Sequence, residues 1–218
     1  MPEPLIAPPV GALLRGATLG FCGKLPVRGD FITSALPRRF VEPWHDWMQR
    51  MLAASREVLV EDWLAAWNEA PIWRFALSPG ICGPDAALGL WMPSVDRAGR
   101  HFPLTFAALA SDCDVPALMR EGGDFLDVAE TAGLDALARD IEPDEIAARL
   151  SAANWGALPE TEALLHLFQG DGAIWWTDGA PRVAAGAFVT VALPDAAEFA
   201  GLLRADGAAQ AGLAEQAP

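Results

Sequence analysis

The spacing of apolar residues alternates between a helical and a strand pattern, and this order limits the folds open to the chain. Phe40, Trp44, Trp47, Met48 and Met51 recur at intervals of three and four residues, which is the pattern of one buried helix face. Shorter apolar runs bounded by Pro, Gly and Asp have the length and composition of strands. These runs are residues 17–22, 72–77, 86–92, 102–110, 174–177 and 185–193.

The resulting order is strand, helices, three strands, helices, two strands and helix, which predicts one α/β domain over residues 17–204. We expect helices to cover a mixed, partly antiparallel sheet. Residues 96–99, with the sequence Asp-Arg-Ala-Gly, are expected to form a hairpin turn between two of its strands. Residues 1–16 are expected to form a flexible N-terminal segment and residues 205–218, rich in Ala, Gly and Gln, a flexible tail.

Capping and turn residues predict where the helices begin. Pro43 suits a first helical turn, so the aromatic helix is expected to start near it. Trp63 and Trp67 indicate a short second helix. Asp114 is a capping residue for a helical run that extends towards Ala138. Further helices are expected to open at residues 142–145, to cover residues 159–168, and to start at residues 194–195.

The net charge of −14 is distributed unevenly and narrows the possible partners. Residues 1–110 hold ten acidic and ten basic residues, whereas residues 111–218 hold nineteen acidic and five basic residues. Nucleic acids and anionic lipids bind proteins that neutralise their phosphates, so we expect neither as a partner. The acidic half is either a solvated face that maintains solubility or a surface for a cationic partner.

The cysteines and the N-terminal sequence predict a soluble, cytoplasmic protein. Cys22, Cys82 and Cys113 are odd in number and widely spaced, which fits neither a disulfide framework nor a zinc site. The first residues lack the basic start and apolar core of a signal peptide. No uncharged apolar run reaches the length of a membrane span, so we expect no membrane insertion.

Motifs for catalysis, metals and cofactors are absent from the sequence. The stretch at residues 20–24 lacks the spacing of a phosphate-binding loop, and Leu25 stands where the hydroxyl residue is required. There is no GxGxxG or GxSxG motif, and the histidines are scattered. We therefore expect no enzyme, no metal and no cofactor. An alternative is a nucleophilic Cys22 approached by His45 or His101, although a free cysteine is more often a small buried apolar residue.

The loop at residues 23–31 concentrates charge between a strand and the aromatic helix. It carries Lys24, which is the only lysine of the chain, together with Arg28 and Asp30. Two hypotheses stand for these residues. They form an exposed contact surface, or they pair with one another or with nearby helix termini and hold the loop in place.

A second unusual segment is the tryptophan pair at Trp175 and Trp176, followed by Thr177. In a strand these two indoles point to opposite faces of the sheet. We favour a core position for both, and the alternative is that one of them is an exposed interaction anchor.

The unusual segments belong to a longer set of motifs. The set comprises Gly20-Phe21-Cys22-Gly23-Lys24-Leu25-Pro26, Arg28-Gly29-Asp30-Phe31, Leu36-Pro37-Arg38, Phe40-Val41-Glu42-Pro43-Trp44, Trp47, Trp73-Arg74-Phe75, residues 89–94, Arg100-His101-Phe102-Pro103-Leu104, Trp175-Trp176-Thr177 and Leu193-Pro194. In this combination the chain resembles the TagF/ImpM family of type VI secretion-associated proteins over roughly residues 17–204. The sequence departs from the family pattern at Cys22, Val27 and Ala173. Some relatives are fused to a protein-phosphatase domain, and we expect no phosphatase activity of this chain.

The resemblance implies a three-layer α/β/α sandwich and a cytoplasmic accessory protein without established catalytic residues. Members of the family are similar in repressing secretion after translation, and their implied partner is the forkhead-associated scaffold of the secretion system. An alternative is a structural subunit that assembles into the apparatus. The candidate interaction residues are Gly23, Lys24, Leu25, Pro26, Arg28, Gly29, Asp30, Phe31, Trp44, Trp175, Trp176 and Thr177.

Overall fold

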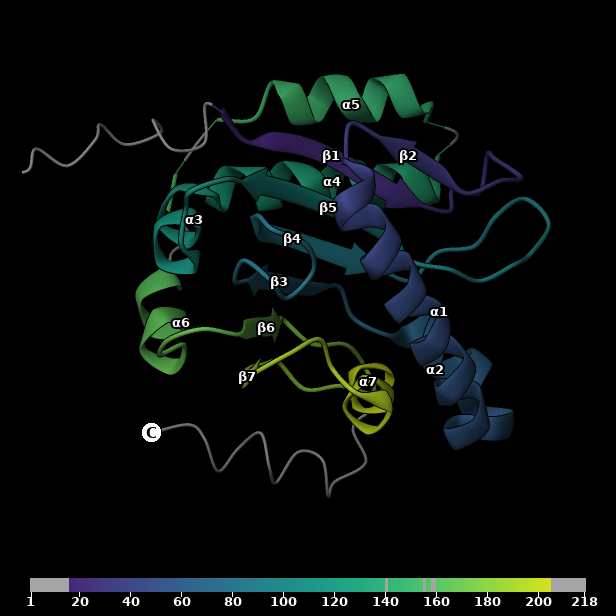
Figure 1. Cartoon of the computed structure of the whole chain (residues 1–218). Helices are drawn as coiled ribbons and strands as arrows, with labels where there is room; N and C mark the ends of the chain where they lie inside the picture. The colour runs from purple at the N-terminus through teal and green to yellow at the C-terminus, as the bar shows by residue number, and fades with distance from the viewer. Residues whose placement is uncertain (1–15, 140, 155, 158–159, 205–218) are drawn as a thin grey trace, which may run out of the picture.

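A computed structural model describes residues 16–139, 141–154, 156–157 and 160–204, so the predicted flexible segments lie outside it except for Gly16. A seven-stranded sheet with the order β2-β1-β5-β4-β3-β6-β7 runs through the domain (Figure 1). Its strands are β1 (Thr18–Gly23), β2 (Ile32–Ser34), β3 (Trp73–Leu77), β4 (Ala86–Met92), β5 (Leu104–Ala110), β6 (Ala173–Thr177) and β7 (Gly186–Thr190).

Every pair of neighbouring strands is antiparallel, so the prediction of a mixed sheet is wrong. A parallel pair needs a crossover connection between two adjacent strands. Here the helical connections join strands that are not neighbours, because β2 leads to β3 and β5 leads to β6 across other strands. The remaining consecutive strands pair as hairpins or meanders.

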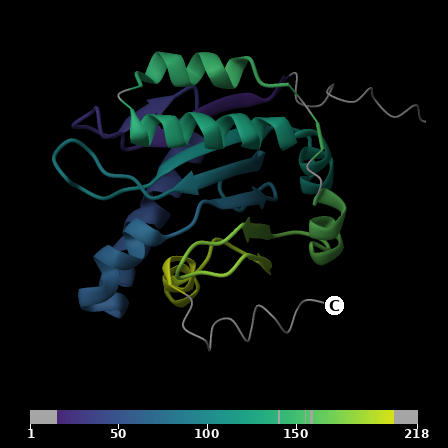
Figure 2. The ribbon, with the colours of Figure 1, turned by 180° about the vertical axis from the view of Figure 1, so that it is seen from behind.

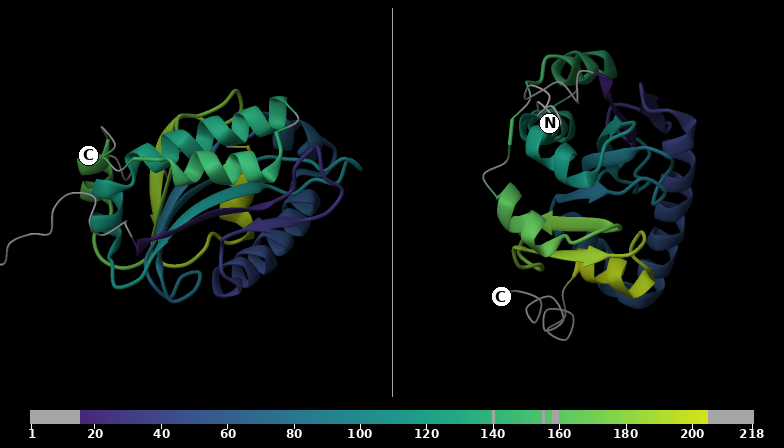
Figure 3. Two further views of the ribbon diagram at one scale, coloured as in Figure 1. Left: turned by 90° about the horizontal axis from the view of Figure 1, so that it is seen from above. Right: turned by 60° about the vertical axis from the view of Figure 1, so that its left-hand side comes forward.

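Helices lie on both faces of the sheet (Figures 2 and 3). One face packs against residues of α1, α2 and α7, including Trp44, Trp67 and Phe199, and the other against residues of α3, α4, α5 and α6, including Phe125 and Ile146. Each face has its own apolar core. The helices are α1 (Arg38–Leu59), α2 (Trp63–Glu69), α3 (Val115–Glu121), α4 (Gly123–Ala138), α5 (Pro143–Ser151), α6 (Thr161–Leu167) and α7 (Ala196–Leu203), with a 3-10 turn at Val60–Asp62.

Helix α1 begins at Arg38, with Pro37 as its N-cap, and not near Pro43 as predicted. Pro43 lies inside the helix, where its ring nitrogen cannot donate to the carbonyl of Arg39. The backbone of Gly83 runs against this carbonyl: a Cβ on Gly83 would lie 2.7 Å from the Arg39 oxygen. Helix α1 therefore contains a proline, and the backbone at Gly83 packs over the turn that lacks this hydrogen bond.

The run predicted from Asp114 to Ala138 is two helices, α3 and α4, which meet at Gly122. Asp114 caps α3 as expected, since its side chain accepts a hydrogen bond of 2.8 Å from the Ala117 amide. At the junction, the Gly123 amide donates to the Gly156 carbonyl at 2.6 Å, and the Gly156 amide donates to the Glu121 carbonyl at 2.9 Å. Backbone hydrogen bonds with Gly156, which is distant in the sequence, are thus made where a single continuous helix was predicted.

Strand β2 was not predicted, because three residues are too few to show an alternating pattern. It pairs with β1 and makes the loop at residues 24–31 the connection of a hairpin, with Gly23 opposite Ile32. The predicted strand at residues 185–193 is shorter, at Gly186–Thr190. Within the described residues, no helix is both long and apolar enough to cross a bilayer.

Candidate interaction site at the β1–β2 loop

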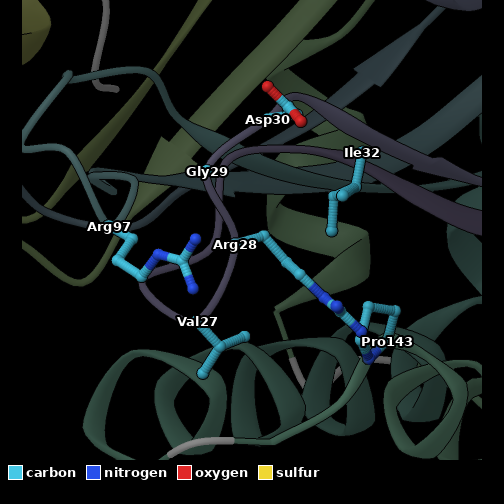
Figure 4. A pocket seen from close by; sticks show the side chains of 7 residues that line it. All are labelled: Val27, Arg28, Gly29, Asp30, Ile32, Arg97 and Pro143. Carbon is cyan, nitrogen blue, oxygen red and sulfur yellow. The ribbon is translucent and has the colours of Figure 1, made fainter.

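Three segments from distant parts of the sequence meet at one end of the sheet: the β1–β2 loop, the β4–β5 hairpin and the start of α5 (Figures 1 and 4). They enclose an open pocket of about 490 Å³. We call it the loop pocket, and its lining residues are Val27, Arg28, Gly29, Asp30, Ile32, Arg97 and Pro143. The surface around it is the part of the predicted interaction region that faces solvent.

Lys24 joins the loop to the hairpin. Its Nζ lies 2.9 Å from Asp96 Oδ2, and the Lys24 side chain is 14% exposed. The same nitrogen donates to the Arg100 carbonyl at 3.3 Å, and the Ser94 hydroxyl donates to the Lys24 carbonyl at 2.7 Å. Lys24 therefore has a structural role, although its partner is Asp96 of the hairpin and not a loop residue or a helix terminus.

The Asp96 carboxylate organises the hairpin turn that the sequence predicted. Its side chain is fully enclosed, and Oδ1 accepts the amides of Ala98 and Arg100, both at 2.9 Å. Oδ2 accepts Arg100 Nε at 2.7 Å and the Lys24 ammonium. Burial opposes ionisation, but these hydrogen bonds outweigh it and hold the pKa of Asp96 well below its usual range.

The tip of the loop is held by backbone contacts and one buried anchor. Leu25 is fully buried in the core that lies under α3, α4 and α5. The Arg97 amide donates to the Arg28 carbonyl at 2.9 Å, and the Arg100 guanidinium donates to the Gly29 carbonyl. These contacts define the backbone of the tip while the side chains of Arg28 and Asp30 remain exposed.

The exposed side chains of the tip differ in their partners. Arg28 forms an ion pair with Glu142, the N-cap of α5, in which both side chains are about half exposed or more. Within the described part of the chain, Asp30 and Arg97 form no side-chain hydrogen bond or ion pair. Phe31 is half-buried and meets the rings of His45 and Phe102 edge-on, with centroids 4.9 and 5.4 Å away.

Gly23 has a steric reason for being glycine. Its φ is +135°, and a Cβ at this position would lie 2.1 Å from the Pro103 carbonyl oxygen. Gly29 is different, since the nearest atom to its Cβ would be 4.0 Å away. Pro26, between the anchored Leu25 and the tip, is half-buried.

Besides Gly23 and Leu25 of the loop, four more of the predicted interaction residues are buried. Trp44 is fully buried, with Nε1 donating to Thr105 Oγ1 at 3.0 Å, and it therefore cannot contact a partner of the folded protein. Trp175 and Trp176 are buried on opposite faces of the sheet, which confirms the core hypothesis and excludes the exposed anchor. The Thr177 hydroxyl is used within the fold, since it donates to the Ile72 carbonyl at 2.7 Å.

Arg97 is the charged residue of the loop pocket that the sequence did not single out, and the apolar lining residues Val27, Ile32 and Pro143 were not candidates either. The sequence identified Arg97 only as part of a hairpin turn, and nothing in the pattern placed that turn beside the β1–β2 loop. The pairing of β1 with β5 brings the two together, since Gly23 lies opposite Leu104. The same pairing explains why Lys24 reaches Asp96.

The chemistry of Cys22 argues against a nucleophile. The side chain is 1% exposed, and burial, with a contribution from Cys82, raises the pKa of Cys22 to about 12. Neither His45 nor His101 forms a hydrogen bond with Cys22. Among the described residues, no group of three or more His, Cys, Asp or Glu side chains is placed to hold a metal ion.

Comparisons with known proteins place this geometry in a family. The model of the TagF N-terminal domain, described as type VI secretion system-associated, matches residues 20–153, which is more than half of the chain. The chain belongs to the TagF family. Its fold is similar to the crystal structure of PA0076 from Pseudomonas aeruginosa PAO1, with a TM-score of 0.75 and 33% sequence identity over 87% of this chain and 96% of that one. A comparison with curated proteins finds no match.

Membership in the TagF family makes the chain a type VI secretion-associated protein, as the motifs predicted. The matched residues include the whole β1–β2 loop and the β4–β5 hairpin, and thus both walls of the loop pocket that the strands bring together. The tryptophan pair at Trp175 and Trp176 lies beyond the matched range.

Proposed function

We propose that this TagF-family chain is a cytoplasmic regulator that represses type VI secretion by binding a component of the apparatus, such as its forkhead-associated scaffold, without catalysing a reaction. The observation that carries the proposal is the exposed tip of the β1–β2 loop beside the β4–β5 hairpin. The loop presents Arg28 and Asp30, and the hairpin presents Arg97, around an open pocket on backbones that Leu25 and Asp96 hold in place.

A preordered surface of this kind suits a binding protein. Side chains that are already positioned lose less conformational freedom on association, so more of the contact free energy appears as affinity. The backbone of the tip has its own hydrogen bonds before any partner arrives. The exposed charges remain available for an intermolecular contact, and such charges contribute to partner specificity.

Titration calorimetry of the full chain against the scaffold protein of its own secretion system tests the proposal. We expect saturable binding that an Arg28→Ala/Asp30→Ala variant weakens by about tenfold, since this variant removes two exposed charged contacts. The matched control is Arg120→Ala/Glu162→Ala. This control also removes one arginine and one acid, from an exposed ion pair between α3 and α6 at the opposite end of the molecule (Figure 1).

Secretion in cells separates the regulator from the structural subunit. Deletion of the gene should raise secretion if the chain is a repressor, and should abolish it if the chain is an assembly subunit. Equal binding by the loop variant and the control variant would remove the loop as the contact surface. Absence of binding to the scaffold, together with raised secretion in the deletion strain, would assign repression to another partner.

A further inference from the structure

Arg97 is an exposed cation without an acidic partner in a strongly acidic chain. Among the lysines and arginines that the structure describes, Arg97 and Arg50 alone have neither an ion pair nor a stacked ring. The chain holds 29 acids against 15 basic residues, so an arginine without a carboxylate partner is unusual in it. Because no carboxylate of the described chain pairs with Arg97, its guanidinium is available to a carboxylate from outside the chain.

The guanidinium of Arg97 lines the loop pocket. In Figure 4 the Arg97 side chain projects towards the backbone of the β1–β2 loop, Arg28 extends in the other direction towards Pro143, and the Asp30 carboxylate points away from both arginines. Two cations thus line one pocket, and the nearest loop acid does not neutralise them. Arginine is suited to such a position because its planar fork can hold a carboxylate with two parallel hydrogen bonds.

The pocket also has an apolar wall. Val27, Ile32 and Pro143 contribute it, and Val27 and Ile32 also pack against the core below, while Gly29 and Asp30 complete the lining. A ligand that fills the pocket therefore meets a charged side and an apolar side at once. A peptide segment carries both kinds of group on neighbouring residues, whereas a free anion carries only charge.

We propose that the loop pocket binds an acidic segment of a partner protein, with carboxylates on Arg97 and on Arg28 and an apolar side chain of the same segment against Val27, Ile32 and Pro143. This inference rests on the proposed function in taking the β1–β2 loop as the contact surface. It adds the chemical character of the partner segment. Arg28 is shared between Glu142 and the incoming carboxylate, which is feasible because their present ion pair is solvent-exposed.

The apolar wall of the pocket favours an acidic peptide over a free anion. Glu142, Asp144 and Glu145 lie at the start of α5 beside the pocket and repel any anion, so a ligand needs a further contact to bind. An exposed arginine–carboxylate contact contributes little by itself, so the apolar contact is needed for affinity. A phosphate on a partner side chain would bind the same arginines, and a comparison of glutamate and phosphothreonine peptides separates the two ligands.

The test uses the full chain labelled with ¹⁵N and three blocked five-residue peptides. The first alternates glutamate with leucine, the second has glutamine in place of glutamate, and the third has phosphothreonine in place of glutamate. Titrations followed by the Nε–Hε resonances of the arginines report directly on the pocket. The Arg97 resonance is identified by its absence from the Arg97→Ala variant.

We expect the glutamate peptide to shift the Arg97 resonance and the glutamine peptide to leave it unchanged. Arg97→Ala should weaken the affinity for the glutamate peptide by about fivefold, which is the upper range for the loss of an exposed charged contact. Arg50→Ala is the matched control, since Arg50 is also exposed and without a partner in the described chain but does not line the pocket. This control should bind the peptide as the unmodified protein does.

Several results would overturn the inference. They are an absence of binding by the glutamate peptide, equal binding by Arg97→Ala, or binding of the phosphothreonine peptide alone. The peptide titration is independent of the secretion scaffold. If the scaffold does not bind and the glutamate peptide still engages Arg97, the proposed partner is wrong and the acidic-segment site stands.

Discussion

Lys24 Nζ lies 2.9 Å from Asp96 Oδ2, and this contact joins the β1–β2 loop to the β4–β5 hairpin. Asp96 is enclosed by four donors, of which two are backbone amides of its own turn. The carboxylate therefore orders the hairpin, while Lys24 fixes the loop to it. The Lys24–Asp96 ion pair holds the backbones of the loop and the hairpin together, and Arg28 and Arg97 therefore keep their positions around the loop pocket.

Asp96→Asn should lower the midpoint of urea unfolding at pH 7. The amide cannot replace the charge that four donors stabilise. The pKa of Asp96 is depressed in the folded state, so its contribution to stability is present above the unfolded pKa, which is about 3.9 for an aspartate. That contribution is lost as the pH falls below about 4 towards the folded pKa. The difference in midpoint between the two proteins should therefore be constant from pH 7 to 5 and shrink at pH 3.

Asp30→Asn is the control for this experiment. Asp30 belongs to the same loop and has no side-chain partner within the described chain. Its substitution should leave the urea midpoint unchanged at pH 7. A midpoint for Asp96→Asn equal to that of the unmodified protein would show that the enclosed carboxylate does not stabilise the hairpin.

Gly122→Ala should destabilise the protein by about 1–3 kcal/mol, the usual range for an overpacked core position. A Cβ on Gly122 would lie 2.0 Å from Cδ2 of the buried Leu88 and 2.9 Å from the Leu118 carbonyl oxygen, so the Leu88 side chain or the junction of α3 and α4 must move. Gly186→Ala is the matched control, since no atom lies within 4 Å of its Cβ position, and it should change stability by less than about 0.5 kcal/mol. Equal free energies of unfolding for the two variants would contradict the close approach at Gly122.

The sequence predicted the elements of this fold better than their arrangement. The helical spacing from Phe40 to Met51 and the apolar runs identify α1 and most strands, because burial of one face imposes a period. The direction of neighbouring strands depends on which strands become adjacent, and a single sequence does not contain that information. The break at Gly122 was missed for a similar reason, since it depends on pairing with the distant Gly156.

The candidate site shows the same division. Charge on a glycine-containing loop identified Arg28 and Asp30, which the structure places at the surface. Aromatic residues in a motif gave no information about exposure, and Trp44 lies in the core. Arg97 joined the site only through the pairing of β1 with β5, which no local pattern encodes. Local chemistry was therefore predictable and long-range proximity was not.

Trp44→Phe should cost about 1–2 kcal/mol more stability than Trp176→Phe. Both indoles are buried, so both substitutions leave a similar void. Trp44 Nε1 donates to the buried Thr105 hydroxyl, which loses its donor in the variant, whereas Trp176 Nε1 has no partner to lose. Urea unfolding of the two variants measures the difference. A larger cost for Trp176→Phe would show that packing, and not the hydrogen bond, dominates at these positions.

Thiol labelling should find at most one reactive cysteine in the folded protein. Burial raises the pKa of Cys22 and of Cys82 to about 12, so at pH 8 neither forms an appreciable amount of thiolate. Cys113 is half-buried, and burial raises the pKa of its thiol to about 11, so its reaction should be slow. All three cysteines should react at once in 6 M guanidinium. Rapid labelling of Cys22 in the folded chain would instead support a chemical role for this thiol. We expect Cys22→Ala to affect secretion as the unmodified protein does.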